Sequence, residues 1–406
     1  MSQGGSDAGR SIMVSPRDVC GCSHGPRLVE ITEKPPSQEA PRHSAKQVSL
    51  AKAFWWSAAA IVAFLLVEAA VFRSGWYIRF LDPSSSTGAV ELNLYWFRRS
   101  TPPKQPEVLV FGDSRIAEGF SSKLADDESR DAIQFWNSGI PGTNPRVWYY
   151  MLRDMDPRRD RFRAIVLALD GYSDQDLNYS REDALTDLNF VIGRLRLTDC
   201  WDFAASMRST QLRTAAFAGC MLKGLTLRRD VRAFLANPPD RLTRARDWRD
   251  HGLRYITDYP GKPENLRGLS VDFERGIIHF PAGLTAGQTD TVRSTVTPYP
   301  APDVGEYTRY RRLWLGRILD LYQNSRTRIV FLELPRAPLR LPDAKTPPRF
   351  LASVAGLRYV SVLPKDTFRD LECPDLFADG LHLNHDGREI FSRRLAREVS
   401  TLIGSR

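Results

Sequence analysis

Apolar positions divide the chain into three kinds of segment. The first 50 residues are rich in Ser, Gly, Pro and charged residues and have little periodicity, which is typical of disorder. Residues 53–72 follow as an apolar run of about twenty residues, the length that spans the hydrocarbon core of a bilayer. From residue 107 onward, short apolar runs of strand character alternate with stretches of helical period. The pattern predicts a tail, one transmembrane helix and a large α/β domain.

The apolar run at 53–72 has the flanks of a membrane span, because aromatic pairs at 55–56 and 76–77 mark its two interfaces. A buried core helix is the alternative. A cleaved signal peptide does not fit, since the run is too long and begins far into the chain. Glu68 lies near one end of the run, where its carboxylate can reach toward the interface or contact a partner helix.

Basic residues around the run indicate its orientation. Arg42, Lys46 and Lys52 precede it, whereas Arg73 and Arg79 follow it. This slight excess favours a cytoplasmic N-terminus. We therefore expect a single-pass protein of the inner or plasma membrane, with its large C-terminal part extracytoplasmic.

The segments after residue 107 repeat in β–α order, which predicts an α/β fold. The run at 164–170 is apolar on both faces, as in the central strand of a parallel sheet. Repeated βα units with short strands predict a flavodoxin-like, doubly wound, mostly parallel sheet. The expected strands are 108–111, 133–137, 164–170, 328–334 and 359–363, and the expected helices are 121–131, 145–155, 306–324 and 386–402.

Residues 175–305 interrupt this alternation and are interpreted as an insertion or cap over the sheet. The stretch 189–234 is mostly helical and basic, and 268–281 has the pattern of a β-hairpin. Residues 73–106 read as a connector, because its closing prolines stop any helix before the first strand. The predicted organisation is a disordered cytoplasmic tail at 1–52, a transmembrane helix at 53–72, a connector at 73–106 and one domain at 107–406 with its insertion at about 175–305.

Charge and composition narrow the class of partner. The 406 residues carry a net charge of +9, and the basic residues are dispersed. Because no basic stripe is interleaved with stacking aromatics, we expect no nucleic-acid partner. The charge is compatible with attraction to an anionic membrane surface or polymer.

The five cysteines give no expected metal site. Cys20 and Cys22 lie beside a histidine, but no second ligand pair follows at a zinc-like spacing. Cys200 and Cys220 could form a disulfide outside the cytoplasm, which would leave Cys373 unpaired. We expect neither a metal nor a cofactor.

Polar turns that follow the predicted strands carry the candidate chemistry. Ser114 follows the first strand in Gly-Asp-Ser, and turns at 137–143 and 170–174 follow the second and third. The carboxyl ends of parallel strands meet at one edge, so these turns should converge with Asp379 and His382 after the fifth strand. A serine there can be a nucleophile if a base lies beside it, and His382 with Asp379 could supply the base and its orienting acid.

These blocks resemble the SGNH (GDSL-like) hydrolase superfamily over residues 107–174 and 327–400. Gly-Asp-Ser matches the first block, and the resemblance makes Ser114 the nucleophile. Gly142 matches the second-block glycine, whose backbone N–H would bind the oxyanion together with that of Ser114. Asp379 and His382 match the last block, so that His382 would deprotonate Ser114 and Asp379 would orient the imidazole.

Two positions depart from the family pattern. The third block usually carries an asparagine that donates to the oxyanion, whereas this chain has Ser173 in the equivalent turn, which could donate instead. Arg115 replaces the leucine of the first block and could contact an anionic substrate or pair with an acid. We expect Asp113 to cap its turn and His385 to begin the closing helix.

The anchor, the basic ectodomain and Gly-Asp-Ser-Arg together resemble a membrane-anchored subset of this superfamily. Its members work beside membrane-bound O-acyltransferases, as do the alginate O-acetylation proteins and the D-alanine transfer protein of teichoic acid synthesis. The resemblance implies acyl transfer to, or deacylation of, a cell-envelope or exopolysaccharide glycan through an acyl-enzyme on Ser114. The alternative is a non-catalytic accessory that binds glycan or assists a membrane-bound O-acyltransferase. The missing asparagine favours this alternative, and the intact Ser, His and Asp favour the enzyme.

Overall fold

A computed structural model describes eight stretches of the chain. They are residues 50–100, 103–169, 181–207, 209–272, 275–296, 304–336, 349–364 and 366–404. Of the predicted tail at 1–52, only residues 50–52 are among the described residues, and the cysteines at 20 and 22 lie outside them.

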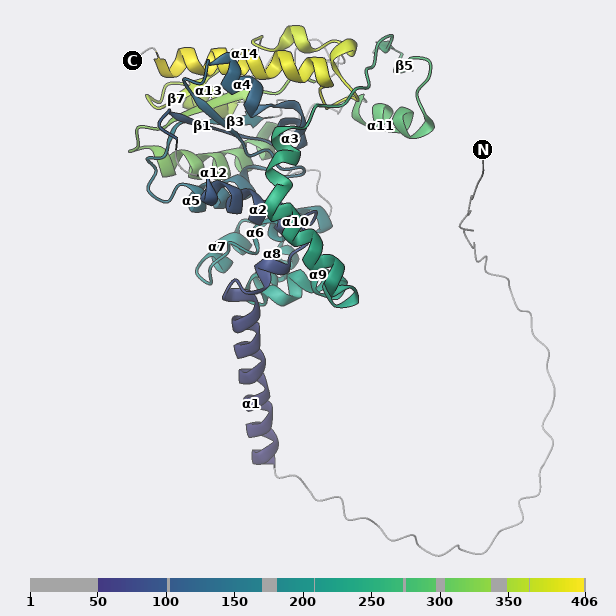
Figure 1. Cartoon of the computed structure of the whole chain (residues 1–406). Helices are drawn as coiled ribbons and strands as arrows, with labels where there is room; N and C mark the ends of the chain where they lie inside the picture. The colour runs from purple at the N-terminus through teal and green to yellow at the C-terminus, as the bar shows by residue number, and fades with distance from the viewer. Residues whose placement is uncertain are drawn as a thin grey trace, which may run out of the picture. The chain divides into compact units, whose positions relative to one another are not determined.

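A five-stranded, wholly parallel sheet forms the centre of the domain (Figure 1). Its spatial order is β2-β1-β3-β6-β7, which is the 2-1-3-4-5 order of flavodoxin-like doubly wound sheets. The five predicted strands are confirmed, with ends shifted by up to two residues. They are β1 (Glu107–Phe111), β2 (Gln134–Asn137), β3 (Phe162–Leu169), β6 (Arg328–Glu333) and β7 (Val360–Val362).

Helices cover both faces of the sheet (Figure 1). Side chains alternate between the faces, so Leu109 and Phe111 of β1 enter one core while Val108 and Val110 enter the other. The first core is closed by α5 (Pro145–Met155) and α12 (Val304–Tyr322), and the second by α4 (Ser122–Glu128) and α14 (His385–Gly404). The predicted helices at these positions are confirmed.

The insertion is helical with one hairpin, as expected. The two hairpin strands pair antiparallel, and Val271 and Ile278 pack against the core beneath α14. Leu188 and Phe203 instead join the core beneath α5, so the insertion contacts both helical layers. Its elements are α6 (Arg181–Val191), α7 (Asp199–Ala205), α8 (Thr210–Met221), α9 (Lys223–Ala236), α10 (Pro238–Thr257), β4 (Ser270–Asp272), β5 (Ile277–His279) and α11 (Ala286–Val296).

The segment 73–106, predicted only as a connector, contains a buried helix. After a short 3₁₀ turn, η2 (Tyr77–Phe80), the chain forms α2 (Ser86–Arg99), capped by the hydroxyl of Ser85. Its apolar side chains pack beside α5 and α6 in the first core, the one that α5 and α12 close. Three polar side chains of α2 are also buried, and each has a partner on another segment. Thr87 donates to Asn189 O, Glu91 pairs with Arg194 at 2.6 Å, and Asn93 accepts from the Ser138 hydroxyl.

The apolar N-terminal helix α1 (Leu50–Glu68) continues into a π-helical turn, η1 (Ala69–Arg73). The combined stretch Leu50–Arg73 is long and apolar enough to cross a membrane, and almost all of its side chains are exposed. This is the candidate span predicted at 53–72. Glu68 is buried and accepts a hydrogen bond from the backbone N–H of Gly224 at 3.0 Å, so it contacts a helix of its own chain.

Candidate active site

The turn after β1 places Ser114 at the carboxyl edge of the sheet. The short helix α3 (Ser114–Gly119) begins at this serine, and the carboxylate of Asp113 caps it by accepting from Arg115 N at 2.9 Å, as predicted. Any side chain on Gly112 would collide with Ile116, since its Cβ would lie 2.2 Å from that residue. Strands β2 and β3 flank β1 on opposite sides, so Ser114 lies at the topological switch point where doubly wound sheets bind ligands.

Three side chains predicted from two distant motifs form one hydrogen-bonded chain. Ser114 Oγ lies 2.8 Å from His382 Nε2, although 268 positions separate the two residues. His382 Nδ1 lies 2.8 Å from Asp379 Oδ2 and 3.0 Å from Oδ1. A carboxylate only accepts hydrogen bonds, so Nδ1 carries the proton and Nε2 is free to accept from the serine hydroxyl. This is the relative arrangement of nucleophile, base and orienting acid.

The backbone explains the spacing of Asp379 and His382. Asp379 Oδ1 accepts from the backbone N–H of Leu381 and of His382, each at 2.8 Å, in an Asx-type turn. Burial opposes ionisation of the carboxyl group, but the His382 side chain and the two backbone N–H donors outweigh it and lower the pKa of Asp379 to about 2. The acid is therefore a carboxylate throughout the neutral range.

The loop that carries Asp379 is anchored on both sides. Ala378 N donates to His382 O at 2.9 Å, which closes the loop on itself. Asn384 then caps the first turn of α14 by accepting from Gly387 N, and its amide donates to Asp375 O at 2.7 Å. The predicted start of the closing helix at His385 is confirmed. These contacts hold His382 in a loop that is anchored to the start of α14.

An ion pair behind the triad was not predicted. Lys262 of the insertion places Nζ 3.6 Å from Asp379 Oδ2 and 2.8 Å from Glu118 Oε2 on α3. Its carbonyl oxygen also accepts from His385 N at 2.8 Å. Lys262 therefore connects the helix that begins at Ser114 with the loop that bears Asp379. No local sequence signal marks it, because the contact joins three distant segments.

The second predicted oxyanion donor, Gly142, lies in the loop that joins β2 to α5. Its φ of +76° is in the left-handed region that favours glycine. The loop is attached close to Ser114, because Ile140 N donates to Gly112 O at 3.1 Å. In the described part of the chain, the backbone N–H groups of Ser114 and Gly142 donate to no protein group. Ser173, the third predicted donor, lies outside the described residues.

Asn137, at the end of β2, fixes the far end of α3. Its amide donates to Ile116 O at 3.1 Å and to Phe120 O at 2.8 Å, and its Oδ1 accepts from Gly139 N. A buried side chain thus links the turn of Gly142 with the helix that carries Ser114. The sequence showed this asparagine only as part of a polar turn.

Arg115 is buried and forms a two-point ion pair with Asp113. Its Nε lies 3.0 Å from Oδ1 and its Nη2 lies 2.7 Å from Oδ2. Of the two alternatives for Arg115, pairing with an acid is the one that the structure contains, and contact with an anionic substrate stays a prediction.

No family model matches this chain, and no curated protein has a matching sequence. Among the described residues there is no cluster of three or more metal-binding side chains.

Proposed function

We propose that this protein is a membrane-anchored serine acyl-transfer enzyme of the SGNH type, with its site outside the cytoplasm. The observation that carries the proposal is the chain of short hydrogen bonds from Ser114 through His382 to Asp379. Its substrate class is a cell-envelope or exopolysaccharide glycan bearing ester-linked acyl groups, and the reaction is O-acetyl transfer or ester hydrolysis.

Acyl transfer begins at Ser114. Its Oγ attacks the ester carbonyl carbon while His382 Nε2 takes the hydroxyl proton, since Nε2 is already 2.8 Å away. The imidazolium that forms is stabilised by the Asp379 carboxylate on Nδ1. The proton then passes from Nε2 to the leaving alcohol oxygen as the C–O bond breaks, and an acyl-serine remains.

The developing oxyanion needs donors beside Ser114. The backbone N–H groups of Ser114 and Gly142 meet this need, because neither is committed to a protein acceptor among the described residues. The acyl-enzyme is resolved when a sugar hydroxyl or a water molecule loses its proton to His382 and attacks the carbonyl. The first acceptor gives transfer and the second gives hydrolysis.

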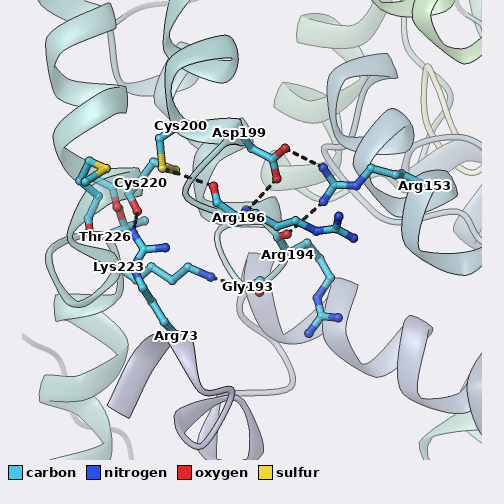
Figure 2. Close-up of a disulfide and its surroundings, with 12 residues drawn as sticks. Arg73, Arg153, Gly193, Arg194, Arg196, Asp199, Cys200, Cys220, Lys223 and Thr226 are labelled. Atoms are coloured by element: carbon cyan, nitrogen blue, oxygen red, sulfur yellow. Dashed lines mark hydrogen bonds and ion pairs between the residues drawn. A yellow bond between two sulfur atoms is a disulfide. The ribbon is translucent and has the colours of Figure 1, made fainter. Parts of the chain in front are cut away.

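Two features outside the site support an extracytoplasmic location. The disulfide between Cys200 and Cys220 is typical of oxidising compartments (Figure 2). The apolar stretch Leu50–Arg73 precedes the whole α/β domain, so a single crossing puts that domain on one side of the membrane. A membrane-bound O-acyltransferase that supplies the acyl group is the partner proposed with this location.

The test is ester hydrolysis by the full-length protein, purified in detergent, with p-nitrophenyl acetate as substrate. We expect Ser114→Ala and His382→Ala to abolish p-nitrophenol release and the burst that accompanies acylation. Ser122→Ala is the matched control, because Ser122 lies in α4 outside the triad. Peptide mass spectrometry should find one acetyl group on the Ser114 peptide of the wild type. If the wild type is no faster than Ser114→Ala and forms no acyl-enzyme, the non-catalytic accessory role is the better explanation.

A further inference from the structure

Two helices of the insertion hold the end of the apolar span. Arg73 Nη2 donates to the carbonyl oxygens of Cys220 at 2.6 Å and Met221 at 2.7 Å, which are the last carbonyls of α8 (Figure 2). Glu68 accepts from Gly224 N in the first turn of α9. A helix carries partial negative charge at its C-terminus and partial positive charge at its N-terminus, so the Arg73 cation and the Glu68 anion are both attracted to the helix end that they contact. The corner between α8 and α9 therefore lies directly beside the residues at which the span ends.

Large apolar side chains are exposed on the helices next to this corner. Trp201 is 75% exposed and packs edge-to-face on Phe217, with ring centroids 6.1 Å apart. Met221 lies one turn farther along α8, and Leu225 follows on α9; they are 37% and 43% exposed. We call these four residues the juxtamembrane patch. The disulfide between Cys200 of α7 and Cys220 of α8 lies near Arg73 (Figure 2). Trp201 and Met221 are the next residues along the chain, so the patch is fixed to the end of the span.

Helices α8 and α9 are cationic, whereas α7 carries Asp199 and Asp202, which pair with Arg153 and Arg317. Residues 210–236 contain one acidic side chain, Asp230, and it accepts from Tyr77 at 2.8 Å and pairs with Arg241 at 2.8 Å. Their exposed arginines are not balanced by any other acid in these helices. They are Arg213, Arg228, Arg229 and Arg232. Exposed aromatic and aliphatic side chains beside arginines are the composition of helices that lie in a membrane interface.

We infer that the juxtamembrane patch docks on the anionic bilayer in which α1 is embedded. The patch adjoins the end of the span through Met221, whose carbonyl Arg73 binds. Trp201, Phe217, Met221 and Leu225 enter the interfacial layer, and the arginines of α8 and α9 face the lipid phosphates. This inference rests on insertion of α1 in a bilayer and does not require catalysis by Ser114.

The test uses full-length protein in vesicles of phosphatidylcholine with or without phosphatidylglycerol, and with or without acyl chains brominated near the headgroup. Bromine quenches a tryptophan only when the two are close together. The chain has nine tryptophans, so the signal of Trp201 is the wild-type fluorescence minus that of Trp201→Phe. We expect brominated lipid to quench this difference, and quenching to be at least about twofold stronger with phosphatidylglycerol.

Trp136 is the control residue, because it lies on β2 and packs on Phe97 in the core. The difference signal from Trp136→Phe should not respond to brominated lipid. Replacing Arg228, Arg229 and Arg232 with glutamine should remove the phosphatidylglycerol effect and leave p-nitrophenyl acetate hydrolysis unchanged. A Trp201 signal that brominated lipid leaves unquenched would overturn the inference and indicate that another protein or a second copy covers the patch. Equal quenching in both lipids would overturn the role of lipid charge.

Discussion

Replacing Asp379 with asparagine should reverse the tautomer of His382. In the native loop, Asp379 Oδ1 accepts from Leu381 N and His382 N, while Oδ2 faces Nδ1 of the imidazole. Asparagine would keep its oxygen on the two backbone donors, which places its NH₂ group against Nδ1. Since an amide NH₂ only donates, His382 would then carry its proton on Nε2. Nε2 could no longer accept the proton of Ser114.

The expected fall in kcat for Asp379→Asn follows from the pKa of Asp379. Its value of about 2, against an ordinary 3.8, means that the folded site favours the carboxylate by about 2.5 kcal/mol, at 1.36 kcal/mol for each pH unit. Loss of that charge alone slows a step that forms an imidazolium by up to about 10²-fold. The reversed tautomer adds to this, so we expect kcat to fall on the order of 10³- to 10⁴-fold for Asp379→Asn.

Hydrolysis of p-nitrophenyl acetate at pH 7 measures the effect. Asp375→Asn is the matched control, because Asp375 is about half exposed and pairs with Arg267 at the surface; its rate should stay within about twofold of the wild type, as for most exposed ion pairs. The folded-state pKa of Asp379 is depressed, so its contribution to stability is complete above about pH 4 and is lost as the pH falls toward 2. The difference in unfolding free energy between wild type and Asp379→Asn should therefore shrink over that interval. A rate for Asp379→Asn within tenfold of the wild type would refute the tautomer argument.

Two further predictions concern contacts made by the insertion. Lys262→Met removes the cation that faces Asp379 Oδ2 and Glu118, and a partly exposed pair of this kind contributes about 1 kcal/mol, so kcat should fall about fivefold with an unchanged KM. Recovery of kcat in Lys262→Arg would show that the charge is responsible. Equal rates in the wild type and both variants would contradict this role of Lys262. Replacing Cys200 and Cys220 with alanine opens a loop with a sequence separation of 20, which should lower the free energy of unfolding by about 3 kcal/mol in urea titrations. A loss below about 1 kcal/mol would show that the neighbouring contacts hold α7 on α8 without the disulfide.

The sheet and its flanking helices were predictable because their signals are local. The helix α5 begins at a proline after a capping asparagine and has a strong apolar stripe, so its predicted bounds and its observed bounds agree. Helix α2 was missed because Glu91 and Asn93 occupy buried positions, where partners on other segments satisfy them. Those partners, Arg194 and Ser138, are not apparent from the sequence of α2 itself. The six residues of α3 are likewise too few for a periodic signal.

The triad was predictable for a related reason, and its surroundings were not. Ser114 begins α3 directly after β1, and Asp379 and His382 lie in the loop before α14, after the last strand, so the sheet topology places both segments at one edge. Lys262 belongs to the insertion, and the alternation of strands and helices does not predict which part of the sheet an insertion contacts. Its approach to Asp379 depends on the bridge between Lys262 and Asn384, which is a tertiary contact.

The contacts of Glu68 and Arg73 with the corner between α8 and α9 limit how far the α/β domain can move from the end of the apolar helix. A flexible connector over 73–106 would let a tethered domain explore about 30 Å around its anchor. Here the chain is instead folded into η2 and α2, and the end of the span is bound by two helices. For the membrane-anchored enzyme proposed above, these contacts would keep the distance between Ser114 and the bilayer within a narrow range. In that proposal, a glycan acceptor has to reach the layer next to the membrane in which Ser114 lies before it can be acylated.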